Sequence, residues 1–299
     1  MKKITLIVFL LGVHLYAATA SNEENIDYTK IDDPQTKEWM DKWLNGSFGL
    51  KPHNVNYILP ISYRTGDKKY KDFNQPLPYD NTEAELQVSL KLAIGSNLFG
   101  LHEQYYLAYT HRAFWQIYTD SSPFRETNYA PDAFVVFPIE DSTSLFQLRN
   151  IKAGFGHISN GQGETHGIQY QYHYQDPNNQ SRSLNFLYTE ATLQHNSIVT
   201  TIKLWYRIPE DIEVDDNPDY VDYTGNAELK LNYFYKKHKF CLKGRYNLRT
   251  NYGAAEGAYS YPIIKDVYFF AKVFNGYGES LIDYNHSITK VAMGFSFSR

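Results

Sequence analysis

Several stretches of the chain alternate between apolar residues and polar or small ones. The clearest covers residues 86–94, where the apolar positions are Leu86, Val88, Leu90, Leu92 and Ile94. A period of two predicts β-strands, because successive side chains of a strand point to opposite faces. The same pattern recurs over residues 107–117, 198–206 and 291–297. The alternation therefore predicts an all-β chain whose strands each present an apolar face.

The first twenty residues have the pattern of a secretory signal peptide. Lys2 and Lys3 precede the apolar Ile4–Leu11, and Ala18-Thr19-Ala20 forms a small-x-small cleavage site. A transmembrane anchor is the alternative, but this apolar core is too short to span a bilayer. Ser21, and not a cysteine, directly follows the cleavage site, so a lipid anchor is not expected. We expect residues 1–20 to be removed and the mature chain to be exported.

Composition narrows the class of β protein. The chain has 299 residues, with 27 Tyr, 18 Phe, 21% charged residues and a mean hydropathy of −0.51. A soluble β-sandwich would also alternate, but the signal peptide, the long strands and the aromatic content favour a membrane β-barrel. The net charge of −4 is spread along the chain and gives no basic footprint for nucleic acid. Cys241 is the only cysteine, which excludes an intramolecular disulfide.

The chain divides into three parts. After the signal peptide, residues 21–52 are polar and show no alternation, so we expect a short N-terminal periplasmic extension, with a short helix around Lys37–Leu44 as one option. Residues 53–299 form the predicted barrel. At about 20 residues per strand and connection, this part gives about twelve antiparallel strands. We expect a tight turn at His195-Asn196-Ser197 and a loop at Asp215–Asp219.

Two polar residues continue an apolar face in the segment 151–161. His157 and Ser159 share the parity of three apolar residues, which are Ile151, Ala153 and Phe155. Residues two apart on a strand lie about 6.6–7 Å apart on one face, a gap that an imidazole can narrow by leaning along the strand. In the segment 183–193, Asn185 shares the parity of Leu187, Ala191 and Leu193. If these two strands pair, Asn185 lies beside His157.

This outward-facing set matches the roles of a hydrolytic triad. Ser159 would be the nucleophile, His157 its base and Asn185 the group that fixes the imidazole tautomer. Most His-x-Ser pairs arise by chance and do no chemistry. Polar groups on a lipid-facing surface are costly and tend to mark function, which favours the catalytic interpretation, although spacing alone does not decide it.

Four blocks of sequence resemble the outer membrane phospholipase A family, in the family's order. They are His157-Ile158-Ser159-Asn160-Gly161, Ser121–Tyr129, Ser181–Thr189 and Gly276–Asn285. The resemblance spans about residues 80–297. It implies a twelve-stranded antiparallel transmembrane β-barrel in the bacterial outer membrane. It also implies calcium-dependent hydrolysis of the sn-1 and sn-2 ester bonds of phospholipids and lysophospholipids by a homodimer.

The resemblance also implies roles for particular residues. The family's nucleophile, base and asparagine fall on Ser159, His157 and Asn185. Its calcium ligands fall on the Gln162 backbone carbonyl, the Ser181 hydroxyl and the backbone carbonyl of Ser121 of the partner subunit. Familiar members have Arg where Gln162 stands, a change that a backbone ligand tolerates.

Two further departures from the family concern a segment and a histidine. Residues 163–179 are longer than expected, and we favour an extended strand pair and loop over a second metal site there. His111 stands where the family tends to have Gln, on the lipid face of the dimer interface. A neutral His111 would bond across the interface, and its protonation at low pH would weaken the dimer. A solvated histidine at the barrel rim is the alternative.

One other class of function stays open at this point. A porin or a structural outer-membrane barrel would have the same alternation and signal peptide. In that case His157 and Ser159 would do no chemistry.

Overall fold

The computed structural model describes residue 30 and residues 50–65, 79–140, 143–163, 171–176 and 179–299. The predicted signal peptide and the optional helix around Lys37–Leu44 lie outside the described residues. Among the residues described, no helix is long and apolar enough to cross a membrane.

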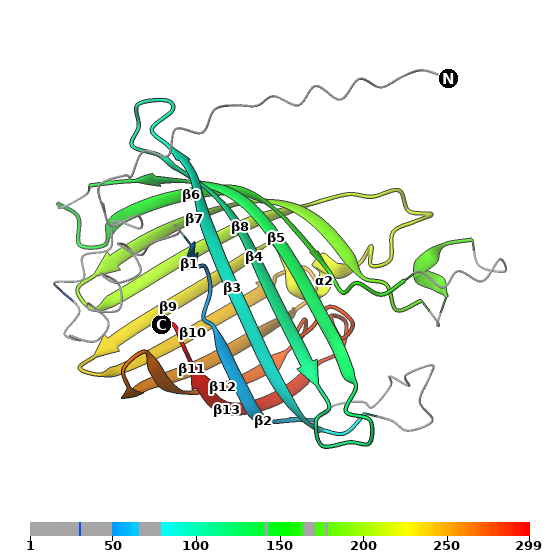
Figure 1. The fold of residues 1–299 in the computed structure, drawn as a ribbon. Helices are drawn as coiled ribbons and strands as arrows, with labels where there is room; N and C mark the ends of the chain where they lie inside the picture. The colour runs from blue at the N-terminus through cyan, green and yellow to red at the C-terminus, as the bar shows by residue number, and fades with distance from the viewer. Residues whose placement is uncertain (1–29, 31–49, 66–78, 141–142, 164–170, 177–178) are drawn as a thin grey trace.

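Twelve antiparallel strands close into a barrel (Figure 1). They are β2 (Tyr57–Thr65), β3 (Thr82–Ser96), β4 (Gln104–Trp115), β5 (Phe124–Pro138), β6 (Gln147–Ser159), β7 (Ser183–His195), β8 (Ile198–Ile208), β9 (Ala227–Tyr235), β10 (His238–Asn247), β11 (Tyr252–Ile264), β12 (Val267–Gly276) and β13 (Ile288–Ser296). Each strand pairs with its neighbours in sequence, and β13 pairs with β2 to close the ring. The predicted twelve-stranded antiparallel barrel is confirmed.

A thirteenth, short strand lies beside this ring. β1 (Leu50–Pro52) pairs with β3 beyond the point where β2 leaves it, with Leu50 opposite Leu92. The last three residues of the predicted extension, 50–52, are thus hydrogen-bonded to the sheet. The division of the chain into an extension up to residue 52 and a barrel from residue 53 stays a prediction.

The alternation of the sequence separates an outer apolar surface from a polar interior. On β3, Val88, Leu92 and Ile94 are exposed, whereas Ser89 and Glu85 are fully buried in the lumen. Exposure on the outer side is contact with lipid in a membrane barrel, so these apolar side chains are where the bilayer requires them.

The connections differ between the two ends of the barrel. Two-residue turns join β7 to β8, β9 to β10 and β11 to β12 at the end where β13 finishes. Each contains a residue with positive φ, namely Asn196, Lys236 or Asp266, as tight hairpins require. The turn predicted at 195–197 is confirmed. The connections after β6, β8 and β12 are longer and lie at the opposite end (Figure 1).

The long connections contain little regular structure. The connection after β8 includes the predicted loop at Asp215–Asp219 and a helix α2 (Tyr220–Thr224). In the connection after β6, residues 171–176 contain a 3-10 turn η2 (His173–Gln175) and no strand. Residues 164–170 and 177–178 of the segment where we expected a strand pair and loop lie outside the described residues. Tyr172, which precedes this turn, and Tyr174, which lies within it, stack on each other, with ring centroids 5.6 Å apart.

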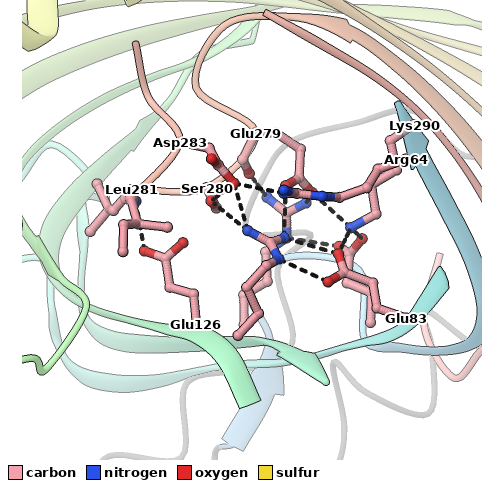
Figure 2. Close-up of polar contacts among 12 residues, drawn as sticks. Arg64, Glu83, Glu126, Glu279, Ser280, Leu281, Asp283 and Lys290 are labelled. Carbon is pink, nitrogen blue, oxygen red and sulfur yellow. Dashed lines mark hydrogen bonds and ion pairs between the residues drawn. The ribbon is translucent and has the colours of Figure 1, made fainter. Parts of the chain in front are cut away.

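A cluster of charged side chains lies inside the barrel, near the end that has the long connections (Figure 2). The connection after β12 turns inward, so Glu279 and Asp283 are buried against the barrel wall. Arg125 joins them to β3, because its guanidinium lies 2.8 Å from Glu83, 2.6 Å from Asp283 and 3.3 Å from Glu279. Lys290 lies 2.8 Å from Glu83 and 2.9 Å from Glu279. Buried charges of both signs thus neutralise each other and hold this connection inside the barrel.

Arg125→Ala should destabilise the barrel strongly. It leaves Glu83, Asp283 and Glu279 short of a buried cation, and losing one partner of a buried ion pair costs about 3–5 kcal/mol. Urea unfolding in lipid or detergent measures the loss. The control is Arg249→Ala, whose ion pair with Asp222 is largely exposed and worth at most about 1 kcal/mol. Equal unfolding free energies for the two variants would contradict the assignment.

Candidate active site

His157 and Asn185 face each other across two neighbouring strands. The register of β6 and β7 places His157 directly opposite Asn185. Their side chains are half-buried on the outer surface, and His157 Nδ1 lies 2.9 Å from Asn185 Oδ1. If the amide oxygen accepts from Nδ1–H, the proton is on Nδ1 and Nε2 keeps a lone pair. An imidazole in that tautomer can take a proton from a hydroxyl.

Ser159 follows His157 on the same face of β6, at the end of the strand. In register it lies between Tyr129 of β5 and Ser183 of β7. Ser159 and Ser183 are both half-buried. The structure therefore brings Ser159, His157 and Asn185 to one small area of the outer surface, as strand parity predicts.

Asn160 joins the two turns that flank this area. Its buried side chain donates from Nδ2 to the Gln180 carbonyl at 2.7 Å. Its Oδ1 accepts from the backbone N–H of Arg182 at 3.0 Å and of Gln162 at 3.3 Å. These bonds hold the residues after Ser159 against those before Ser183.

The predicted calcium ligands divide into a pair and a distant residue. Gln162 and Ser181 belong to the two turns that Asn160 joins. Ser121 lies apart, exposed in the connection between β4 and β5, with a positive φ of 61°. A carbonyl and a hydroxyl suit calcium, which prefers oxygen ligands. Within the described parts of the chain, no group of three or more His, Cys, Asp or Glu residues is placed to hold a metal ion.

The carboxylate of Glu210 lies next to Asn185, and the sequence patterns did not single out this residue. Asn185 Nδ2 donates to Glu210 Oε1 at 3.4 Å. Burial, and then the negative charges of Asp215 and Asp216, raise the pKa of Glu210, while Arg207 and the bond from Asn185 oppose the shift. Glu210 continues the outward parity of Tyr206 and Ile208 past the end of β8, and that parity was the available signal.

His111 lies on the same outer surface, two strands from Ser159. It is directly opposite Val88 and Tyr129, and its ring meets the Tyr129 ring edge-on at 5.3 Å. The sequence parity that placed His111 outward is confirmed, whereas its role in a dimer stays a prediction.

Comparison with known proteins adds the decisive observation. Residues 35–297 match the family model described as Phospholipase A1. The chain belongs to the phospholipase A1 family. The Phospholipase A1 of Escherichia coli K12 is 32% identical over 290 residues, which cover 96% of this chain and 94% of that protein.

Solved structures of phospholipase A1 relatives agree. A Salmonella typhi outer membrane phospholipase dimer with bound calcium has a TM-score of 0.74 and 33% identity, covering 84% of this chain and 93% of that one. An Escherichia coli outer membrane phospholipase A, an active-site mutant with an asparagine changed to alanine, has a TM-score of 0.73 and 33% identity, with 84% and 93% covered.

Membership of the phospholipase A1 family settles the class of function. The chain is an outer-membrane β-barrel enzyme, a phospholipase A1 that hydrolyses carboxylic esters. The alternative of a non-enzymatic barrel is not supported.

Gly161→Ala should disturb the turn after Ser159, and Gly163→Ala should not. Gly161 has a φ of +65°, and an added Cβ would lie 2.7 Å from Tyr129 Cε2, whereas nothing lies within 4 Å at Gly163. A residue forced into such a conformation costs about 1–3 kcal/mol. We expect lower unfolding free energy and lower phospholipase activity for Gly161→Ala alone. Similar losses in both variants would count against this account of the turn.

Proposed function

We propose that this phospholipase cleaves the sn-1 and sn-2 ester bonds of phospholipids and lysophospholipids with a Ser159–His157–Asn185 triad on its lipid-facing surface. The observation that carries the proposal is the hydrogen bond between His157 and Asn185, directly opposite each other, with Ser159 two residues further on the same face. The active-site asparagine of the Escherichia coli relative is consistent with it.

The triad residues account for both halves of the reaction. His157 takes the proton of Ser159 as the serine oxygen attacks the ester carbonyl, and it then gives that proton to the departing alcohol. That alcohol is a lysophospholipid when the substrate is a phospholipid, and the deacylated glycerophosphodiester when the substrate is a lysophospholipid. The acyl group is then bonded to Ser159. A water molecule attacks this ester with its proton going to His157, which returns the proton to Ser159 as the fatty acid leaves. Asn185 accepts from the imidazole throughout and holds its orientation.

Placement on the outer face suits an apolar substrate. Phe155 and Leu187, which are paired across β6 and β7 next to the triad, are exposed on the same face. Acyl chains can thus reach Ser159 from the bilayer without being transferred to water, a transfer that would cost about 0.8 kcal/mol for each CH₂.

Calcium and a second subunit belong to the proposal as well. Gln162 and Ser181 offer oxygen atoms beside the triad, and the remaining ligand would be the carbonyl of Ser121 of the partner subunit. Bound calcium supplies positive charge that stabilises the negative oxygen formed at the carbonyl. The dimeric, calcium-bound structure of the Salmonella typhi relative supports both parts.

Ser159→Ala should abolish activity, and Ser183→Ala should preserve it. The two serines are directly opposite on the same surface and both are half-buried, so Ser183 is a matched control. Loss of a nucleophile should lower kcat by a factor of about 10³ or more. The assay uses mixed micelles with calcium, and a sulfonyl fluoride should label wild type at Ser159. Full activity of Ser159→Ala would show that the nucleophile is wrong.

The dimer should weaken at low pH if His111 lies in its interface. Protonation places a charge on an apolar surface next to Tyr129, which is costly away from water. Cross-linking with calcium at several pH values should show fewer dimers at low pH for wild type and no change for His111→Gln. A dimer that is independent of pH in wild type would contradict this role.

A further inference from the structure

The amide of Asn185 poses a problem of orientation that a carboxylate would not. An amide can present its oxygen to a protonated Nδ1 of His157, or its NH₂ to a bare Nδ1. Only the first arrangement leaves a lone pair on Nε2, and only that tautomer can act as a base toward a serine. A triad that uses asparagine therefore needs something that fixes the amide.

Glu210 meets that need, because an ionised carboxylate only accepts hydrogen bonds. Its Oε1 accepts a hydrogen bond from Asn185 Nδ2 at 3.4 Å. The other amide atom, Asn185 Oδ1, lies 2.9 Å from His157 Nδ1. We propose that Glu210 is a positioning residue of the hydrolytic site, which holds the Asn185 oxygen toward His157 and so selects the catalytic tautomer. This inference rests on the proposed function of the triad.

The backbone explains why Glu210 reaches this place. Ile208 is directly opposite Asn185 and is the last residue of β8. Pro209 follows, and since proline has no N–H, it cannot continue the hydrogen-bonded ladder. Glu210 is therefore the first residue of outward parity beyond the paired strand, diagonally beside Asn185.

The two aspartates near Glu210, Asp215 and Asp216, have partners of their own. Asp215 pairs with Arg207 at 2.6 Å. Asp216 accepts from Asn179 at 2.7 Å and lies 3.8 Å from His173 Nδ1. Among the described residues, the Asn185 amide donates a hydrogen bond to the Glu210 carboxylate.

Glu210 also supplies charge that asparagine lacks. His157 becomes a cation when it takes the proton of Ser159, and a neutral amide stabilises that cation less than an aspartate would. A carboxylate on the far side of the amide polarises the chain of hydrogen bonds and adds its own attraction. Burial and the charges of Asp215 and Asp216 raise the pKa of Glu210, so this help is lost at a higher pH than for an ordinary glutamate.

The first test is Glu210→Gln, with Glu213→Gln as the control. Both variants lose one negative charge from the same connection, but Glu213 is exposed. We expect Glu210→Gln to lower kcat about tenfold with KM little changed, as losing a charged hydrogen bond predicts. The acid limb of its rate profile should move to lower pH, because protonated His157 loses a favourable charge and Glu210 no longer titrates. Glu213→Gln should match wild type in both respects.

The second test changes Asn185 in a double-mutant cycle. In Asn185→Asp the residue facing His157 only accepts hydrogen bonds, so it needs no orientation, and Glu210 becomes a repulsive neighbour. Adding Glu210→Gln to Asn185→Asp should therefore raise kcat, the opposite of its effect on wild type. A residue that only stabilises the fold would lower activity in both backgrounds.

The outcomes separate this inference from the proposed function. The rate of sulfonyl labelling of Ser159 should fall with kcat in Glu210→Gln, and Glu210→Asp, which keeps the charge, should retain the wild-type acid limb. If Ser159→Ala is inactive while Glu210→Gln matches wild type, or if Glu210→Gln lowers kcat in both backgrounds, the role of Glu210 is wrong and the triad stands. If Ser159→Ala is active, the proposed function itself fails.

Discussion

Closure of the sheet is the constraint on which the rest of this structure depends. Inside a bilayer an unpaired backbone N–H or C=O costs several kcal/mol, so a sheet can cross only if it has no free edge. The pairing of β13 with β2 removes the last edge. Closure then fixes two surfaces with opposite requirements, an outer one in lipid and an inner one away from it, and every strand must serve both.

The two surfaces use polar residues in different ways. In the lumen, charged side chains are plentiful because they neutralise each other, as Arg125 does with Glu83 and Asp283. On the outer surface a charge has no such surroundings. The area of Ser159, His157 and Asn185 there carries an imidazole, a hydroxyl and an amide, and the carboxylate of Glu210 lies just beyond the last paired residue of β8.

Position along the strands links this chemistry to the connections. Ser159 ends β6 and Asn185 lies near the start of β7, so the site sits where the regular wall gives way to longer loops. Strand pairing places His157 opposite Asn185. The irregular connections contribute the two turns that Asn160 joins, and they bring Glu210 to Asn185. The site thus lies where the paired strands end and the connections begin.

The sequence by itself determined the class of fold and which residues face outward. Period-two alternation is a property of each strand alone, so Ser159, His157 and Asn185 could be placed on one surface without knowing their partners. The match of sequence blocks indicated the family. Only the tertiary structure decided register, which puts Asn185 opposite His157 and Tyr129 opposite Ser159, because pairing depends on contacts between segments far apart in the chain. It also decided the short turn η2 and the contact of Glu210 with Asn185, since neither loop has a repeating pattern that sequence can reveal.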